Sequence, residues 1–245
     1  GAYQDYGMHK DKLVDLFTEN KGLGFGAMRR HMREIVADFS KIERTNEKKP
    51  RVGIVGEIYV KYAPLGNNNL EEFLLKEGAE PVVPGVTDFI IFKVNNRYVD
   101  VGLYGGSPLK KAAMWIFQNF VIKCQNIMIE AIEEEGTFRP MSHFSELQEL
   151  VKGYLGYGNK MGEGWLLTAE MLELIHSGTN NIVCTQPFGC LPNHVAGKGM
   201  MRKLKDDYPD SNIVAVDYDP GATKINQENR IKLMLANALR HEQSE

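Results

Sequence analysis

The stretch NIVCTQPFGCLPNHVAGKG, residues 181–199, decides the fold that this sequence predicts. It opens with a short β-branched apolar run, passes through a turn rich in cysteine and proline, and enters a helical pattern near His194. This order predicts a strand, a loop and a helix. In an open parallel sheet, ligands bind at the loops after the carboxyl ends of the strands, because helix N-termini and unpaired backbone N–H groups converge there.

Three more apolar runs predict further strands in the same sheet. They lie near residues 52–56, 81–84 and 212–217, and helical patterns separate the runs from one another. A strand, a helix and a strand within one βαβ unit form a parallel pair with a right-handed crossover. We therefore expect an α/β fold, a three-layer domain with about four parallel strands, N-terminal helices and a helical insertion.

The order of these patterns also predicts the domain organisation. Residues 1–49 are expected to form an N-terminal helical arm, and residues 50–240 the α/β domain with a helical insertion at about 87–160. Within it, the pattern indicates a loop at 57–66 and fits either a short helix or a strand at 87–104. Ser107 followed by Pro108 is typical of a helix start.

Composition narrows the classes of function. Hydrophobic residues make up 43% and charged residues 25% of the chain, as in an ordinary globular protein. The net charge of −3 argues against a nucleic-acid partner, because neutralising phosphates requires a basic face. No long apolar run and no signal-peptide pattern occur, so we expect no membrane association and a cytoplasmic location.

Two of the three cysteines are the first candidates for chemistry. Cys184 and Cys190 lie six residues apart across a Pro-Gly turn, and thiolates select zinc or iron–sulfur clusters. Cys190 is the more suggestive, because the start of a helix beside it stabilises an anionic ligand. The alternative interpretation has Cys184 buried in the strand and Cys190 free in the loop.

A second hypothesis makes Cys190 a nucleophile. His194 would then act as its base, and Asp217 or Asp219 would orient the imidazole. His194 equally fits a residue that only hydrogen-bonds the loop. The two aspartates fit either contacts to a ligand hydroxyl or caps of the last helix.

Glycine pairs and one arginine leave further alternatives open. Gly197-Lys198-Gly199 fits a phosphate-binding turn or close packing of a helix on the sheet. Gly162-Glu163-Gly164 fits an anion site or a helix entry. Arg230 fits a carboxylate or phosphate clamp, or a solvated charge.

Several of these motifs together resemble the 2-hydroxyacyl-CoA dehydratase superfamily, and most closely its acyl-CoA dehydratase activase-related proteins. The similarity runs from about residue 50 to 238, and its most specific part is the Pro-Phe-Gly-Cys block. The residues that carry it are Gly56-Glu57-Ile58-Tyr59, Gly162-Glu163-Gly164-Trp165, Gln186-Pro187-Phe188-Gly189-Cys190-Leu191-Pro192-Asn193-His194-Val195 with Gly197-Lys198-Gly199, Asp217-Tyr218-Asp219-Pro220-Gly221 and Asn226-Gln227-Glu228-Asn229-Arg230.

The resemblance implies a flavodoxin/Rossmann-like C-terminal domain of a two-domain iron–sulfur subunit. In the better-known members, three cysteines from both halves hold a [4Fe-4S] cluster, and an ATP-dependent activator delivers one electron at low potential. The function implied is low-potential electron transfer or radical dehydration of an acyl-CoA. The implied partners are the missing N-terminal half and the ATP-dependent activator, with an acyl-CoA as ligand.

Carried over by position, Cys190 is the best cluster ligand and Cys184 a weaker one. Gly189, His194 and Asp219 are expected to line the cofactor pocket beside Cys190. The matching region contains neither the partner half nor the ATP-binding motifs of the activator, so this chain alone does not complete a three-cysteine site. The rival hypothesis is a non-catalytic docking or scaffold domain with structural cysteines.

Overall fold

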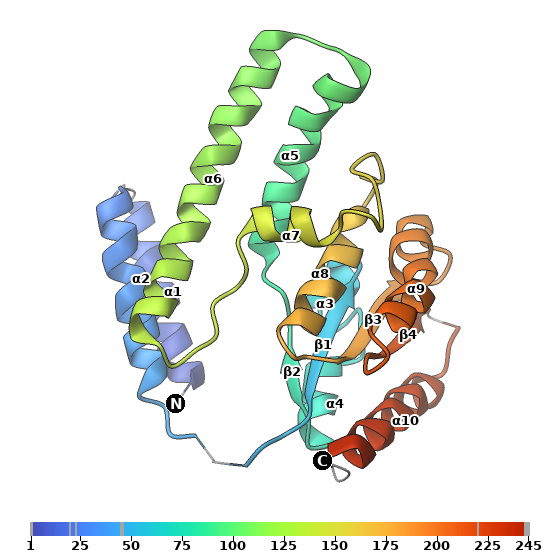
Figure 1. Ribbon diagram of the computed structural model, residues 1–245. Helices are drawn as coiled ribbons and strands as arrows, with labels where there is room; N and C mark the ends of the chain where they lie inside the picture. Colours follow the sequence, from blue (N-terminus) through green and yellow to red (C-terminus); the bar gives the residue numbers. More distant parts are fainter. Residues whose placement is uncertain (1, 20, 23, 45–46, 220, 243–245) are drawn as a thin grey trace. The chain divides into compact units, whose positions relative to one another are not determined.

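A computed structural model describes residues 2–19, 21–22, 24–44, 47–219 and 221–242, and these form two compact units. The first unit comprises the described residues up to Glu47 together with Ser107–His143. The second comprises Lys48–Gly106 and the described residues from Phe144 onward (Figure 1). The expected insertion at 87–160 is therefore shared between the units: its central part groups with the N-terminal helices.

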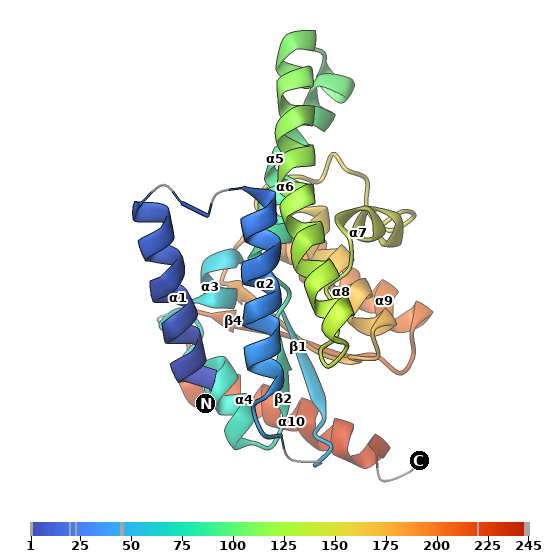
Figure 2. The same cartoon turned by 90° about the vertical axis from the view of Figure 1, so that its left-hand side faces the viewer.

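The first unit consists of helices α1 (Ala2–Thr18), α2 (Phe25–Ser40) and α6 (Pro108–Glu135), and α2 lies along α6 (Figures 1 and 2). Arg33 donates to both carboxylate oxygens of Glu134, at 2.6 and 2.8 Å. The pair is exposed, so solvent and salt screen its contribution to stability. Ser107 caps α6 by accepting a hydrogen bond from the Lys110 amide, in agreement with the sequence pattern.

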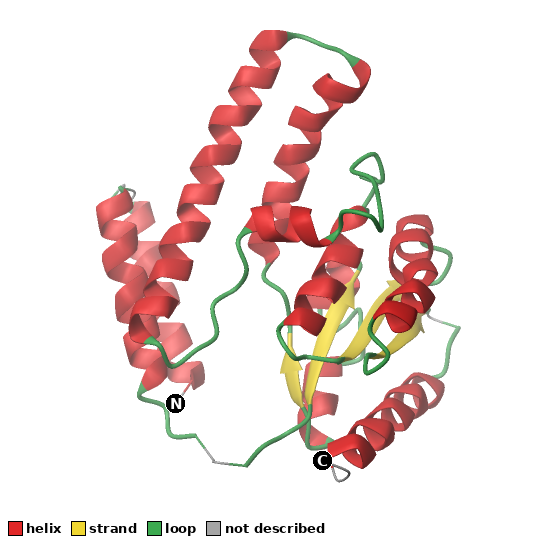
Figure 3. Cartoon of the chain, in the orientation of Figure 1, coloured by secondary structure: helices red, strands yellow, loops and turns green. Residues whose placement is uncertain are grey.

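The second unit is built on a four-stranded, all-parallel sheet in the order β2-β1-β3-β4 (Figure 3). The strands are β1 (Arg51–Gly56), β2 (Glu80–Val82), β3 (Asn181–Pro187) and β4 (Asn212–Tyr218). All four lie where the apolar runs predict them. The expectation of an α/β, three-layer, flavodoxin/Rossmann-like fold with helices flanking a parallel sheet is thereby confirmed.

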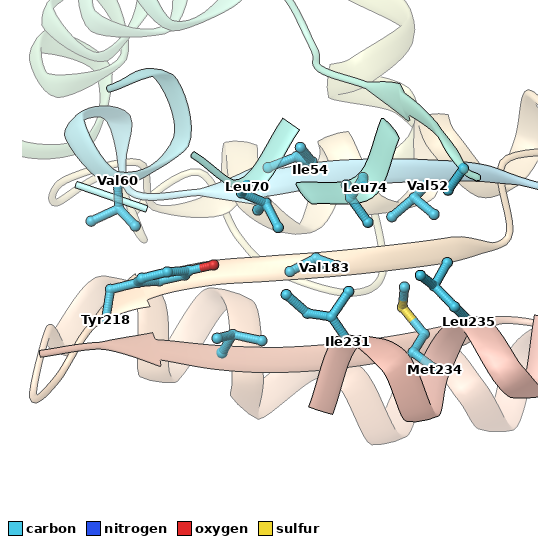
Figure 4. Packing of buried hydrophobic residues seen from close by; sticks show 12 residues of the cluster. Val52, Ile54, Val60, Leu70, Leu74, Val183, Tyr218, Ile231, Met234 and Leu235 are labelled. Carbon is cyan, nitrogen blue, oxygen red and sulfur yellow. The ribbon is translucent and has the colours of Figure 1, made fainter. Parts of the chain in front are cut away.

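Alternate residues of the strands pack on opposite faces of the sheet, which explains why β1 and β3 read as continuous apolar runs. On one face, Val52, Ile54 and Val183 contact helices α4 (Leu70–Lys76) and α10 (Lys224–Glu242) (Figure 4). The other face packs on α8 (Trp165–His176) and α9 (Met201–Asp207).

Three segments differ from the sequence pattern or resolve its alternatives. Residues 87–104 lie within a helix, α5 (Val86–Tyr104). The expected loop at 57–66 contains a short helix, α3 (Ile58–Tyr62), because the Glu57 side chain accepts from the Val60 amide at 2.9 Å and so caps it. The helix expected from His194 begins as a π-helical turn (Asn193–Gly197) and a 3₁₀ turn (Lys198–Met200) before α9. The remaining helix is α7 (Phe144–Leu150).

Within the described ranges, none of the helices has both the length and the apolar character needed to cross a membrane.

Candidate functional site

The candidate site lies at the carboxyl ends of β1, β3 and β4. From β1, the chain adds β2 on one side and β3 on the other, so the strand order reverses between β1 and β3. In open parallel sheets such a switch point, outside the carboxyl ends of the strands, is where ligands bind. The loops after β1 and β3 therefore border the expected ligand position.

Gly56 lets these two loops approach each other. Its φ is +147°, and a Cβ atom there would lie 1.9 Å from the carbonyl oxygen of Thr185. The amide of Glu57 donates to this same carbonyl at 3.1 Å. A side chain at position 56 would therefore push the end of β1 away from β3.

The loop after β3 presents the thiol of Cys190. This residue is half-buried, and its amide donates to the carbonyl of Pro187 at 3.2 Å, closing a turn that contains Gly189 at φ +74°. The buried Asn193 donates through Nδ2 to Cys190 Sγ at 3.2 Å. An N–H donor on sulfur favours the thiolate, the form that binds metals.

Glu163 fixes the amide that contacts the thiol. Its Oε2 accepts from Asn193 Nδ2 at 3.1 Å, and its Oε1 accepts from the amide of Ile58 at 3.4 Å. Glu163 is buried, and the Lys93 ammonium donates to the neighbouring carbonyl of Gly162. One carboxylate thus ties the loop after β1 to the loop after β3.

His194 faces Asp217 rather than the thiol. Its Nδ1 lies 2.9 Å from the carbonyl oxygen of Cys190, so Nδ1 carries the proton, and Nε2 lies 3.9 Å from Asp217 Oδ1. Gln186 donates to the same carboxylate oxygen at 2.6 Å. The geometry brings His194 and Asp217 together, but the contact of the Cys190 thiol is with Asn193. The hydrolase hypothesis therefore lacks its nucleophile–base contact here.

Two amide oxygens at this edge have no hydrogen-bond partner among the described residues: Oε1 of Gln186 and Oδ1 of Asn193. Both side chains are fully buried. Their amide nitrogens face the carboxylates of Asp217 and Glu163, so the opposite orientation of either amide would set oxygen against carboxylate. Buried acceptors of this kind are normally satisfied, by water or by a ligand that donates a hydrogen bond.

Cys184 lies in a different environment. It is fully buried between the sheet and α8, and a Cβ atom on Gly197 would come within 3.0 Å of its sulfur. Burial, and then the charges of Glu170 and Asp217, raise the pKa of the Cys184 thiol to about 12. The sulfur is enclosed by this packing, so the arrangement gives no support to Cys184 as a metal ligand. The contact with Gly197 also favours close helix packing as the reason for that glycine.

The remaining predicted pocket residue, Asp219, lies at the surface. Asp219 is exposed in the turn after β4, where its carbonyl accepts from the amide of Ala222 at 2.9 Å. Cys124 lies in α6, in the first unit, and burial raises the pKa of its thiol. In the part of the chain that the structure describes, no cluster of three or more His, Cys, Asp or Glu side chains is arranged to hold a metal ion.

A buried ion pair that no sequence pattern indicated joins α3 to α8. Lys61 Nζ of α3 lies 2.8 and 3.1 Å from the two carboxylate oxygens of Glu170 in α8, and both side chains are buried. Burial raises the pKa of the Glu170 carboxyl, and the Lys61 charge opposes that rise. In the sequence, Lys61 and Glu170 each stand within a mostly apolar helical segment. Such a position does not indicate which residue is the partner.

Comparison of the chain with protein-family models, with curated proteins and with solved structures finds no match.

Proposed function

We propose that this chain is the C-terminal domain of a 2-hydroxyacyl-CoA dehydratase-like iron–sulfur protein, and that Cys190 is the thiolate it contributes to a [4Fe-4S] cluster. The observation that carries the proposal is the position of Cys190. Its half-buried sulfur lies in the loop after β3, beside the switch point of the sheet, and receives a hydrogen bond from Asn193.

The donor set fits one cluster ligand from this chain. Iron–sulfur clusters need deprotonated thiolates, with N–H donors to the sulfurs. Cys190 accepts such an N–H donor in a half-buried position, whereas Cys184 is fully buried in the sheet. The remaining ligands would come from a second protein part, for which the N-terminal half implied by the resemblance is the candidate.

Apolar side chains beside the thiol support burial against such a part. Phe188 and Leu191 flank Cys190 and are 74% and 72% exposed. Exposed apolar residues gathered around a functional group are typical of a surface that a partner covers. Covering them would exclude water from the Cys190 sulfur.

When bound, the cluster would supply one-electron chemistry at low potential, with the electron delivered by an ATP-dependent activator. The residues of this chain would hold and orient the thiol that binds the cluster. Glu163 holds Asn193, Asn193 keeps its N–H on the sulfur, and His194 holds a proton on Nδ1.

Anaerobic reconstitution with iron and sulfide tests the proposal. The full chain is treated with and without the N-terminal half of a dehydratase-type subunit, and iron, acid-labile sulfide and visible absorption are measured. We expect uptake with the partner half present, loss of uptake in Cys190→Ala, and retention in the matched control Cys124→Ala. Absence of uptake with the partner half, or equal uptake by Cys190→Ala, would contradict the proposal.

The exposure of Phe188 and Leu191 also favours a second candidate, a docking or scaffold domain without metal. In that case the double variant Phe188→Ser and Leu191→Ser would weaken binding of the partner half, while the complex of the unaltered chain would contain no iron. Iron in that complex excludes this candidate.

A further inference from the structure

A cationic groove runs along the outer edge of β4, away from the candidate site. Strand β4 is the last in the sheet order, so its outer edge has no neighbouring strand among the described residues. A groove of about 530 Å³ lies there between α9 and the strand. Met201 and Val214 are among its apolar residues, and Lys198, Arg202, Lys205 and Arg230 are its cations.

The cations gather on one side of the helical segment. Lys198, Met201, Arg202 and Lys205 all line the groove, so the segment presents its three cations on one side. All three cations of this segment are exposed. The only carboxylate that lines the groove is that of Asp206, whose Oδ2 lies 4.0 Å from Arg202 Nε. The groove is thus positive on a chain whose net charge is −3.

Side chains of α10 already occupy part of the strand edge. Arg230 donates to the carbonyl of Ala215 at 3.2 Å, and Gln227 donates to the carbonyl of Asp217 at 3.0 Å. Side chains that cover the carbonyls of an edge strand hinder the pairing of another strand. Recognition in this groove therefore depends on its cations and its apolar floor, not on strand addition.

We infer that the groove binds an acidic segment of a partner polypeptide, one that carries carboxylates beside apolar side chains. Carboxylates complement Lys198, Arg202 and Lys205, while apolar side chains fit the floor near Met201 and Val214. A nucleic acid fits less well, because its extended phosphate backbone requires a broad basic face and the chain as a whole is acidic. This inference is independent of the function proposed for Cys190.

Peptide selection and binding on the full chain test it. Peptides are selected from a random display library, then synthesised, and their binding is measured by fluorescence anisotropy. We expect selected peptides to combine Glu or Asp with apolar residues. Versions with Gln and Asn in place of Glu and Asp should bind at least about tenfold more weakly. Affinity should also fall as salt rises.

Matched variants locate the binding. The double variant Arg202→Glu and Lys205→Glu reverses two charges in the groove and should weaken binding by about tenfold or more. The control Lys203→Glu and Lys232→Glu makes the same change in net charge at one position on α9 and one on α10, both outside the groove, and should bind as the unaltered chain does. Circular dichroism checks that both variants fold.

Three results would overturn the inference. One is a selection without enrichment of acidic peptides. Another is an equal loss of binding in the groove variant and in its control. The third is displacement of the peptide by inorganic pyrophosphate or duplex DNA at lower concentrations than the peptide itself needs, which would indicate a phosphate site.

Discussion

Cys184 and Cys190 are six residues apart, yet they occupy opposite environments. Cys184 lies inside β3, fully buried under α8, with its thiol pKa raised to about 12. Cys190 lies in the loop that leaves the strand, half-buried, with an amide N–H on its sulfur. The difference shows that the end of the strand separates a sulfur used for packing from one available for chemistry. Residue type and spacing alone do not separate them.

Alkylation of the native protein with iodoacetamide tests the difference between the two cysteines and should give the largest effect. Cys190 should react directly, whereas Cys184 should react only through local or global opening, at least about a thousandfold more slowly. Mass spectrometry of the labelled peptides measures both rates. Reaction of Cys184 at a rate close to that of Cys190 would show that Cys184 is not buried in solution.

The next largest effect is expected from the buried ion pair between Lys61 and Glu170. Lys61→Met leaves the Glu170 carboxylate buried without its partner, and we expect it to lower the free energy of unfolding by about 3–5 kcal/mol. The double variant Lys61→Met and Glu170→Leu removes both charges and should regain most of that loss. Urea unfolding measures both. A single variant as stable as the unaltered chain would mean that the pair is not buried in solution.

The pH dependence of stability sharpens the difference between the two sulfurs. Because the pKa of Cys184 in the folded protein lies above the ordinary value of 9.0, its contribution to stability is complete below pH 9.0 and is lost as pH rises toward about 12. We expect a slope of at most about 1.4 kcal/mol per pH unit in that window. That contribution to the slope should be missing in Cys184→Ala and retained in Cys190→Ala, as urea unfolding at several pH values will test. Tyrosines with raised pKa values, such as Tyr218, add to the slope in both variants alike.

The smallest effect tests the hydrogen bond to Cys190. Asn193→Leu keeps the bulk of the side chain but removes the N–H that faces the sulfur, so the hydrogen bond that orients the sulfur for attack is lost. Alkylation of Cys190 at neutral pH should slow by about tenfold. If the rate is unchanged while circular dichroism shows a folded variant, the amide does not act on the sulfur.

The sequence predicted the sheet well, because strands buried on both faces produce short, β-branched apolar runs between helices. It also predicted that Cys190 would follow a strand in a loop. It did not predict α3, whose start depends on a cap from Glu57, and it predicted a regular helix at His194, where the chain forms a π-helical turn against Cys184.

The contacts around the thiol were less predictable, since they join distant parts of the chain. Glu163 reaches Asn193 thirty residues later, and Lys61 pairs with Glu170 across 109 residues. The glycines that flank Glu163 marked it as notable, but no local pattern indicated Asn193 as its partner. The assignment of Cys184 as a second ligand could not be judged from spacing, because only packing against α8 buries it.

Protection of Cys190 by iron tests the central claim most directly. The full chain, combined with the partner half and reconstituted with iron and sulfide, is alkylated before and after removal of iron by a chelator. We expect Cys190 to be protected from alkylation while iron is present and to react after the iron is removed. Cys184 should stay unreactive in both cases. Equal alkylation of Cys190 in the iron-loaded and iron-free complexes would contradict it.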